Sequence, residues 1–195
     1  MSWEQVYQQW LNEENIPENL KNELKDLNTV PEKCEDAFYA PLEFGTAGMR
    51  GILGAGINRM NIFTVRQATE GLARFMDTQD PETKRRGVAI AYDSRHMSPE
   101  FAMEAAKTLA KHDIPSFVFE SLRPTPELSF AVRYFKAFAG IMITASHNPA
   151  AYNGYKVYGE DGGQMPPADA DALTKYVRSI ENSLKIDVLS DEEVA

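Results

Sequence analysis

The sequence has almost no cysteine and no long hydrophobic run. Its single cysteine, Cys34, cannot form an internal disulfide, so nothing points to secretion. No segment approaches the roughly 18 consecutive apolar residues that a membrane-spanning helix needs. The first residues, Met1 to Gln5, also lack the basic region and apolar core of a signal peptide. Together these absences favour a cytoplasmic protein without a membrane partner.

The sequence also has no excess of basic over acidic residues. The 29 acidic residues outnumber the 20 lysines and arginines, which gives a formal net charge of -9. A sequence-independent nucleic-acid binder needs a basic face to displace counterions, so the charge argues against that class. It does not exclude a phosphorylated small molecule, because a few arginines can make the field inside a cleft positive.

Residues 1–40 have the pattern of a helical extension. Apolar side chains recur at helical spacing near its start, and Ser2 with Gln5 can form a capping box. Two further helices are expected at 17–28 and 31–40, each beginning at a proline. The expected role of this extension is packing rather than chemistry.

From residue 41 onward, strand-like and helix-like segments alternate. Strands are expected at 87–92, 116–119, 138–144 and 155–158, and helices at 61–76, from Ser98 onward, at 126–136 and at 167–184. Such alternation predicts an α/β fold, a three-layer α/β/α sandwich with a mostly parallel mixed sheet, over residues 41–185. The acidic tail at 186–195 has no evident partner element and is interpreted as the start of a linker to a further domain.

One of two unusual segments is rich in glycine. Five of the twelve glycines lie between residues 45 and 56. Such a segment can aim backbone N–H groups at an anion, with Arg50 adding a two-pronged donor. It is not a P-loop, because Ile57 and Asn58 stand where lysine and serine or threonine are required. From these residues alone, phosphate binding and a plain glycine-rich turn both stay open.

The other segment is Thr-Ala-Ser-His-Asn-Pro at 144–149, directly after the apolar run at 138–143. Ligands of open α/β sheets collect beyond the carboxyl ends of strands, which is where Ser146 falls. A serine that only satisfies backbone groups in a loop is the alternative. A hydrolase nucleophile is excluded, since the Gly-x-Ser-x-Gly elbow is absent and the adjacent His147 is poorly placed to act as its base.

Five motifs carry a family resemblance. They are Gly-Thr-Ala-Gly-Met-Arg-Gly at 45–51, Asn-Arg-Met-Asn at 58–61, Tyr-Asp-Ser-Arg at 92–95, the serine segment at 144–149 and Asn-Gly-Tyr-Lys at 153–156. In this order they resemble the first domain of the α-D-phosphohexomutases, the phosphoglucomutase and phosphomannomutase superfamily. The Gly-Thr-Ala-Gly before the arginine is most similar to the phosphoglucomutase and phosphopentomutase branch.

The resemblance implies a role for each matching residue, all of them in binding a phosphorylated sugar. Ser146 would carry the phosphoryl group as phosphoserine, and His147 would contact that group or a sugar hydroxyl. Lys156 would assist proton transfer, and Arg50 would neutralise charge near the phosphoserine. Thr46 would lie in the same substrate-facing loop as Arg50.

The resemblance also implies Mg²⁺, but with few ligands from this sequence. The family's magnesium loop, Asp-Gly-Asp-x-Asp-Arg, belongs to its second domain, whereas Asp161 is a lone carboxylate in Asp-Gly-Gly-Gln. Ser146 would therefore be a ligand only through its phosphate. Asp93 and Arg95, in the third motif, are interpreted as a structural turn pair.

The activity implied is a mutase that interconverts sugar 1-phosphates and terminal-carbon phosphates, with glucose as the first candidate, through a bisphosphate intermediate. A sugar 1,6-bisphosphate would prime the serine. The remaining domains of the parent chain would be the partners of this one, so these 195 residues alone are expected not to complete a turnover. The alternative is a non-catalytic binding or regulatory module that retains the fold.

Overall fold

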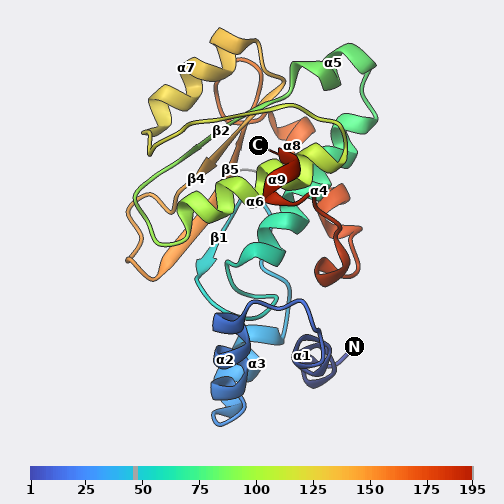
Figure 1. Ribbon diagram of the computed structural model, residues 1–195, viewed down its shortest axis with the longest axis vertical. Helices are drawn as coiled ribbons and strands as arrows, with labels where there is room; N and C mark the ends of the chain where they lie inside the picture. The colour runs from blue at the N-terminus through green and yellow to red at the C-terminus, as the bar shows by residue number, and fades with distance from the viewer. Residues whose placement is uncertain (46–47, 195) are drawn as a thin grey trace.

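The computed structural model describes residues 1–45 and 48–194, and it contains a five-stranded sheet with helices on both faces (Figure 1). The helices are Trp3–Leu11 (α1), Glu18–Leu27 (α2), Pro31–Phe38 (α3), Ile62–Asp77 (α4), Pro81–Arg86 (α5), Ser98–Lys111 (α6), Thr125–Phe135 (α7), Pro167–Arg178 (α8) and Asp191–Val194 (α9), with a 3₁₀ turn at Ser183–Lys185 (η1). The strands are Met49–Ile52 (β1), Val88–Tyr92 (β2), Ser116–Val118 (β3), Ala139–Ile143 (β4) and Tyr152–Tyr158 (β5).

The sheet has the strand order β1-β5-β4-β2-β3. Strand β2 pairs in parallel with β3 and β4, whereas β5 is antiparallel to both β4 and β1. The connection at 144–151 is too short for the crossover that parallel neighbours need, so β5 runs back along β4. The other four strands point the same way, and the mixed α/β sheet predicted from the sequence is confirmed.

The two faces of the sheet bury different side chains. Ile141 and Ile143 of β4 pack in the cluster that includes α4, α6 and α8, whereas Met142 packs with Leu128 and Val132 of α7. This alternation is the period of two expected of a strand that is buried on both faces. The α/β/α layering therefore follows from apolar residues at successive positions of the central strands.

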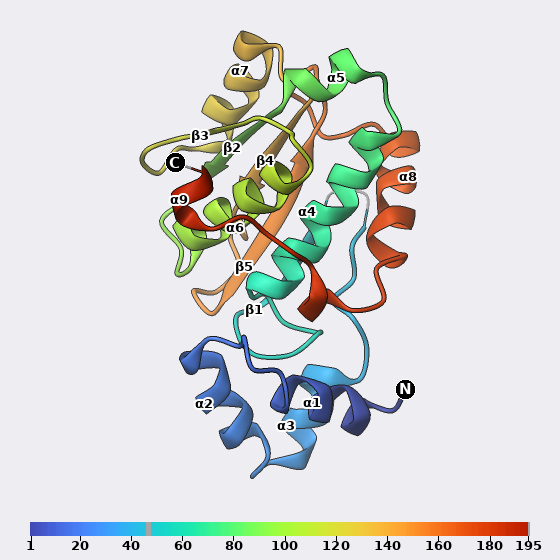
Figure 2. The ribbon, with the colours of Figure 1, turned by 45° about the vertical axis from the view of Figure 1, so that its right-hand side comes forward.

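The N-terminal helices α1–α3 lie beyond the end of the sheet at which β1 ends (Figures 1 and 2). Their own small core is centred on Trp10, whose ring contacts Phe38 and Phe63 edge-on at centroid distances of 5.7 and 5.2 Å. Since Phe63 belongs to the first turn of α4, these contacts attach the helical extension to the sandwich. The predicted N-terminal helices are present, and the capping box at Ser2 forms.

Several elements differ from the prediction: β5 begins at Tyr152 rather than at residue 155, and the short helix α5 was not predicted. The helix expected at 167–184 ends at Arg178, because Ser179 and Asn182 hydrogen-bond to nearby backbone groups and compete with helix continuation. The glycine-rich segment contains the edge strand β1, which was not predicted, since glycine at residue 51 hides the strand pattern.

The acidic tail differs most from the prediction, because it does have a partner element. The N–H of Leu189 donates to the carbonyl of Lys107 on α6, and the Lys107 ammonium is 3.0 Å from Asp191. Lys111 of the same helix pairs with Asp187. The tail therefore follows the basic side of α6. Among the described residues, no helix is long and apolar enough to cross a membrane.

Candidate functional site

Ser146 lies in the loop that follows β4, at the edge of the sheet where the parallel strands end. The run Ala139–Ile143 is buried throughout, but Ser146 and His147 are exposed. Ser146 has a φ of 55°, in the left-handed region that non-glycine residues rarely adopt. Such a conformation costs about 1–2 kcal/mol, and it persists only where surrounding contacts fix it.

Backbone hydrogen bonds hold this loop and connect it to the sheet. The Ser146 N–H donates to the Thr144 hydroxyl at 3.0 Å, and the Thr144 N–H donates to the carbonyl of Gly154 on β5 at 3.0 Å. The Asn148 N–H donates to the Ala145 carbonyl at 3.1 Å and closes a turn around the serine. The serine hydroxyl is thus presented outward from a loop whose backbone is bonded inward.

The imidazole of His147 makes only a marginal contact with the serine. Its Nδ1 is 3.5 Å from the Ser146 Oγ, at the outer limit of a hydrogen bond. Both side chains are exposed, so the histidine is open to whatever approaches the serine from outside. This geometry agrees with the sequence argument that His147 is not the base of a hydrolase.

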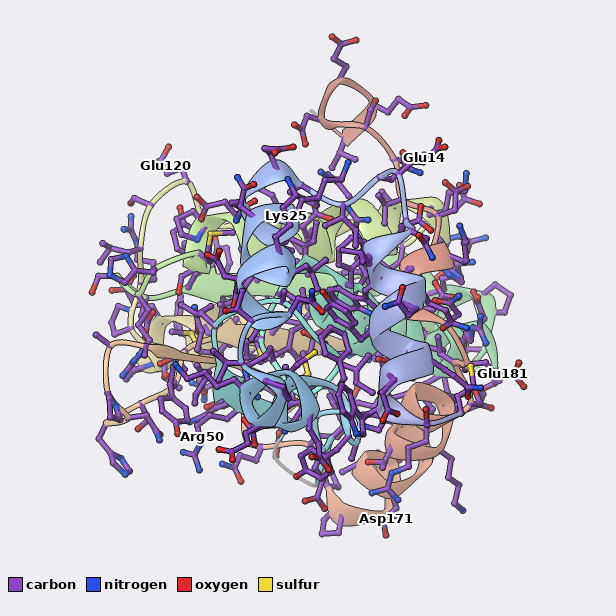
Figure 3. All side chains as sticks on the ribbon, turned by 90° about the horizontal axis from the view of Figure 1, so that it is seen from below. Glu14, Lys25, Arg50, Glu120, Asp171 and Glu181 are labelled. Atoms are coloured by element: carbon purple, nitrogen blue, oxygen red, sulfur yellow. The ribbon has the colours of Figure 1, made fainter. Side chains whose placement is uncertain are left out.

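Arg50 and Lys156 project from the sheet on the face that carries α7. Lys156 pairs with Met142, whose side chain packs under α7, and Arg50 pairs with Gly154 two residues away on β5. Gly154 also accepts the bond from Thr144, so Arg50 is separated from the serine loop by the width of one strand. Figure 3 shows the Arg50 side chain extending outward from the ribbon.

Both cations line one open pocket of about 830 Å³. Its other lining groups come from the end of α3 and the segment after it, from the glycine-rich segment and from the loop after β5, and they include Tyr39, Asn58 and Gln164. Ser146 and His147 do not line this pocket. Arg50 and Lys156 therefore line the same pocket, whereas the serine loop is connected to this region through the bond from Thr144 to Gly154 of β5.

The glycines of the first segment are used for close packing. A Cβ on Gly48, which has a φ of 109°, would lie 1.9 Å from the Tyr155 carbonyl oxygen. The N–H groups of Gly45, Gly48 and Gly54 all donate to backbone carbonyls. Because these three donors are occupied, the described part of the segment favours the turn interpretation over an N–H cradle for an anion, and the Arg50 side chain offers its donors to the pocket.

Tyr155 directly precedes Lys156 on β5, and its side chain lies on the opposite face of the sheet, in the core with α4. Its hydroxyl is 3.0 Å from that of Thr69 on α4, and its side chain is buried. Burial raises the pKa of the Tyr155 phenol far above its ordinary value, and the hydrogen bond with Thr69 only partly opposes this. Tyr155 is therefore a neutral core residue rather than an acid or base of the site.

The residues present do not make a magnesium site by themselves. In the described ranges, no three histidine, cysteine, aspartate or glutamate side chains cluster as a metal would require. Asp161 accepts a hydrogen bond from the Gly163 N–H at 2.8 Å, as an ordinary turn residue does. Thr46, the remaining residue predicted for the site, lies outside the described residues.

Two residues near the serine, Arg95 and Asn148, have structural features that the sequence did not predict. Arg95 was interpreted as half of a turn pair, and the turn exists, since the Arg95 N–H donates to Asp93 Oδ1 at 3.0 Å. The guanidinium, however, reaches across to the serine loop, as described below. Asn148 carries the one buried side-chain polar atom without a partner in the described part of the chain, its Oδ1. Both residues lie in motifs of the family resemblance, but no sequence signal indicates these contacts.

The exposed Ser146 thus lies just past a parallel strand of an α/β/α sandwich, at the edge where ligands of open α/β sheets generally collect. The family model described as phosphoglucomutase/phosphomannomutase, alpha/beta/alpha domain I, matches residues 41–184. The chain therefore belongs to this family and carries its domain I, as the sequence resemblance predicted.

Individual relatives agree with this assignment. The phosphoglucomutases of Staphylococcus epidermidis and Staphylococcus saprophyticus are 45% and 43% identical over 84% and 91% of this chain. These matches cover only 29% and 31% of the relatives, so the chain spans less than a third of their length.

Solved structures show the same fold. A protein from Thermus thermophilus described as a phosphomannomutase matches 71% of this chain and 30% of its own, with a TM-score of 0.63 and 33% identity. Parafusin from Paramecium, a phosphoglucomutase, matches 73% of this chain and 26% of its own, with a TM-score of 0.58. At 20% identity, the second likeness supports the fold alone.

Proposed function

We propose that this chain is the phosphoserine-bearing domain of a cytoplasmic sugar-phosphate mutase, with Ser146 as the residue that carries the phosphoryl group. One observation carries the proposal: an exposed serine held at a φ of 55° just beyond the carboxyl end of β4. A serine with a purely structural role would turn its hydroxyl toward the backbone, whereas here the Ser146 Oγ lies 3.5 Å from His147 Nδ1 and both residues are exposed.

The proposed chemistry is a pair of phosphoryl transfers. In the first, a hydroxyl oxygen of the sugar phosphate attacks phosphorus, the bond from phosphorus to Ser146 Oγ breaks, and the hydroxyl proton passes to the serine oxygen. The product is a sugar bisphosphate. In the second, Ser146 Oγ attacks the other phosphoryl group, the bond from phosphorus to the sugar oxygen breaks, and the serine proton passes to that oxygen. The serine is regenerated as phosphoserine.

The cations supply what these transfers need. Positioning and charge neutralisation account for most of the acceleration in phosphoryl transfer. In the proposal, Arg50 neutralises charge on the phosphoryl oxygens, Lys156 assists proton transfer, and His147 contacts the phosphoryl group or the sugar. Thr46 is proposed to join Arg50 in holding the sugar. Support for the pair of cations comes from the pocket that Arg50 and Lys156 both line.

The proposed substrates are glucose 1-phosphate and glucose 6-phosphate, with the corresponding 1,6-bisphosphate as the priming intermediate. The names of the staphylococcal relatives support glucose. Mg²⁺ is proposed to bind through the Ser146 phosphate and through groups of further domains. For the 195-residue chain alone, we propose the phosphoryl-carrying step without a complete turnover.

The test is the mass and position of phosphate on the chain. We expect one added phosphate, located at Ser146 by peptide mapping, after native purification or after incubation with glucose 1,6-bisphosphate. Ser146→Ala should abolish it. Ser121→Ala is the matched control, since Ser121 is also an exposed serine past a parallel strand, β3, and it should leave the phosphate in place.

A phosphate on another residue would contradict the proposal. No phosphate under either condition would favour a non-catalytic module that retains the fold. Conversion of glucose 1-phosphate to glucose 6-phosphate by the 195-residue chain would contradict only the requirement for further domains.

A further inference from the structure

The guanidinium of Arg95 is inserted into the loop that carries Ser146. It donates four hydrogen bonds to backbone carbonyls of that loop and of the first residue of β5, at distances of 2.6 to 3.0 Å. Nη2 donates to the carbonyls of Ser146 and Asn148, and Nη1 donates to those of Pro149 and Tyr152. Arg95 lies in the turn between β2 and α6, so these bonds join two loops that are distant in sequence.

The donors of this guanidinium are occupied. An arginine has five N–H groups in a rigid planar fork, and four of them serve the loop. The fifth, on Nε, faces Asp93 Oδ2 at 3.5 Å, and the Arg95 side chain is only 14% exposed. An arginine that bound a substrate phosphate would keep donors directed at solvent. Arg95 therefore acts on the loop rather than on a ligand.

The Arg95 backbone is itself held in place. Asp93 Oδ1 accepts hydrogen bonds from the Arg95 N–H and from the Ser98 hydroxyl, both at 3.0 Å. The amide nitrogen of Asn153, at the start of β5, donates to the His96 carbonyl and to the Ser98 hydroxyl, both at 2.9 Å. Asn153 and Ser98 are completely buried. The turn that carries Arg95 is thus held by Asp93, which follows β2, and by Asn153 of β5.

These contacts explain how Ser146 keeps its left-handed backbone. The direction of the Ser146 carbonyl is set by its backbone dihedrals, and the 2.8 Å bond from Arg95 Nη2 fixes that direction. The bonds to Asn148, Pro149 and Tyr152 hold the return of the loop to β5. We infer that Arg95 is a positioning residue, which holds the serine loop so that the Ser146 hydroxyl faces an incoming phosphoryl group.

Only the chemical consequence of this inference rests on the proposed function. The mechanical part, order in the loop, is tested by hydrogen exchange of the backbone amides at 145–152. Arg95→Met should speed their exchange by about tenfold or more while the amides of β2 and β4 stay unchanged. Arg95→Lys, which keeps the charge but loses the fork, should give an intermediate rate. Arg133→Met, at an exposed arginine of α7, is the control and should change nothing in the loop.

The second readout is the rate at which glucose 1,6-bisphosphate phosphorylates Ser146. Because misplacement by about 1 Å can cost a reaction about 10²-fold, we expect Arg95→Met to slow loading by about tenfold or more, with partial rescue by Arg95→Lys. Loop amides that exchange as in the unaltered chain, or equally faster exchange everywhere, would overturn the inference. So would equal loading of all variants.

The two readouts separate this inference from the proposed function. If the unaltered chain takes up no phosphate while the loop amides respond to Arg95, the proposed function fails and the loop contact stands. If Ser146 is phosphorylated at the same rate in every Arg95 variant, the function stands and the positioning role fails. Arg95→Lys covers the case in which Arg95→Met does not fold.

Discussion

The backbone N–H of Ser146 donates to the hydroxyl of Thr144 over 3.0 Å, and this bond ties an exposed residue to a buried one. Thr144 directly follows β4 and is buried, with 7% of the residue exposed. The Ser146 side chain, two residues later, is open to solvent. The transition from core to site is therefore made within one short turn.

Thr144→Val should weaken this turn. It removes the acceptor of the Ser146 N–H while keeping the shape of the side chain, so we expect a loss of about 1–3 kcal/mol in the free energy of unfolding. Thr144→Ser should restore most of it. Urea titration measures the difference, with Thr174→Val on α8 as the control, since the Thr174 hydroxyl bonds only within its own helix. A similar loss in the two valine variants would contradict the role given to Thr144.

Gly48→Ala should be much more damaging than Gly45→Ala. At residue 48 the added methyl would meet the Tyr155 carbonyl at 1.9 Å with the backbone at a φ of 109°, whereas at residue 45 nothing lies within 4 Å. We expect a loss of about 3 kcal/mol at 48 and less than about 0.5 kcal/mol at 45. Thermal or urea unfolding measures the loss of stability in the two variants. Equal losses would show that β1 does not need this close approach to β5.

Replacing either cation of the pocket should affect chemistry more than stability. Arg50→Met and Lys156→Met remove charge beside an open pocket, so we expect stability changes below about 1 kcal/mol. We expect the loading of Ser146 from glucose 1,6-bisphosphate to fall by about tenfold or more in each, because charge neutralisation is lost. Lys175→Met, at an exposed lysine of α8, should load normally. Normal loading in both pocket variants would remove them from the proposed mechanism.

Glu23 should make stability depend on pH. Burial raises the pKa of the Glu23 carboxyl above its ordinary value of 4.5, and the nearby Asp26 raises it further. A hydrogen bond from the Ala55 N–H and the positive charge of Arg59 oppose this rise. The folded protein thus binds this proton more tightly than the unfolded chain does. Its contribution to stability is complete below pH 4.5 and is lost as pH rises through the folded pKa.

Glu23→Gln cannot ionise, so the unfolding free energy of the unaltered chain should fall relative to this variant as pH rises above 4.5. Urea titrations from about pH 4 to about pH 7 measure the trend. Glu14→Gln, at an exposed position of the loop after α1, should run parallel to the unaltered chain. A gap between the chain and Glu23→Gln that stays constant with pH would contradict the assigned pKa direction.

The periodicity of apolar side chains, every two residues in strands and every 3.6 residues in helices, was enough to predict the layers of the fold. The buried run of β4 and the helices α4 and α7 lie within a residue or two of their predicted bounds. The edge strand β1 was missed because its glycine and arginine do not have a strand composition. The docking of the tail was missed for a different reason: its partners, Lys107 and Lys111, are distant in sequence and lie on the surface of another helix.

The exposure of Ser146 could be predicted from the sequence, but the contacts that hold its loop could not. The position of Ser146 past a buried strand indicated an exposed group, which the structure shows. No periodicity indicates that the Arg95 guanidinium reaches backbone carbonyls at residues 146 to 152, because main-chain acceptors leave no mark in a sequence. The direction of the Asn148 amide is equally invisible at that level.

The last turn of α3 has a consequence for how this domain can be cut from its chain. The carbonyls of Asp36 and Ala37 accept hydrogen bonds from Asn58, and Gly56 packs so closely on Ala37 that an added Cβ would lie 2.4 Å from its oxygen. The family match starts at residue 41, after these acceptors. A segment excised at that residue would lose both backbone carbonyls that accept from Asn58, and it would lose the contact between the Trp10 and Phe63 rings. We therefore expect a segment that starts at residue 41 to be less stable than the 195-residue chain.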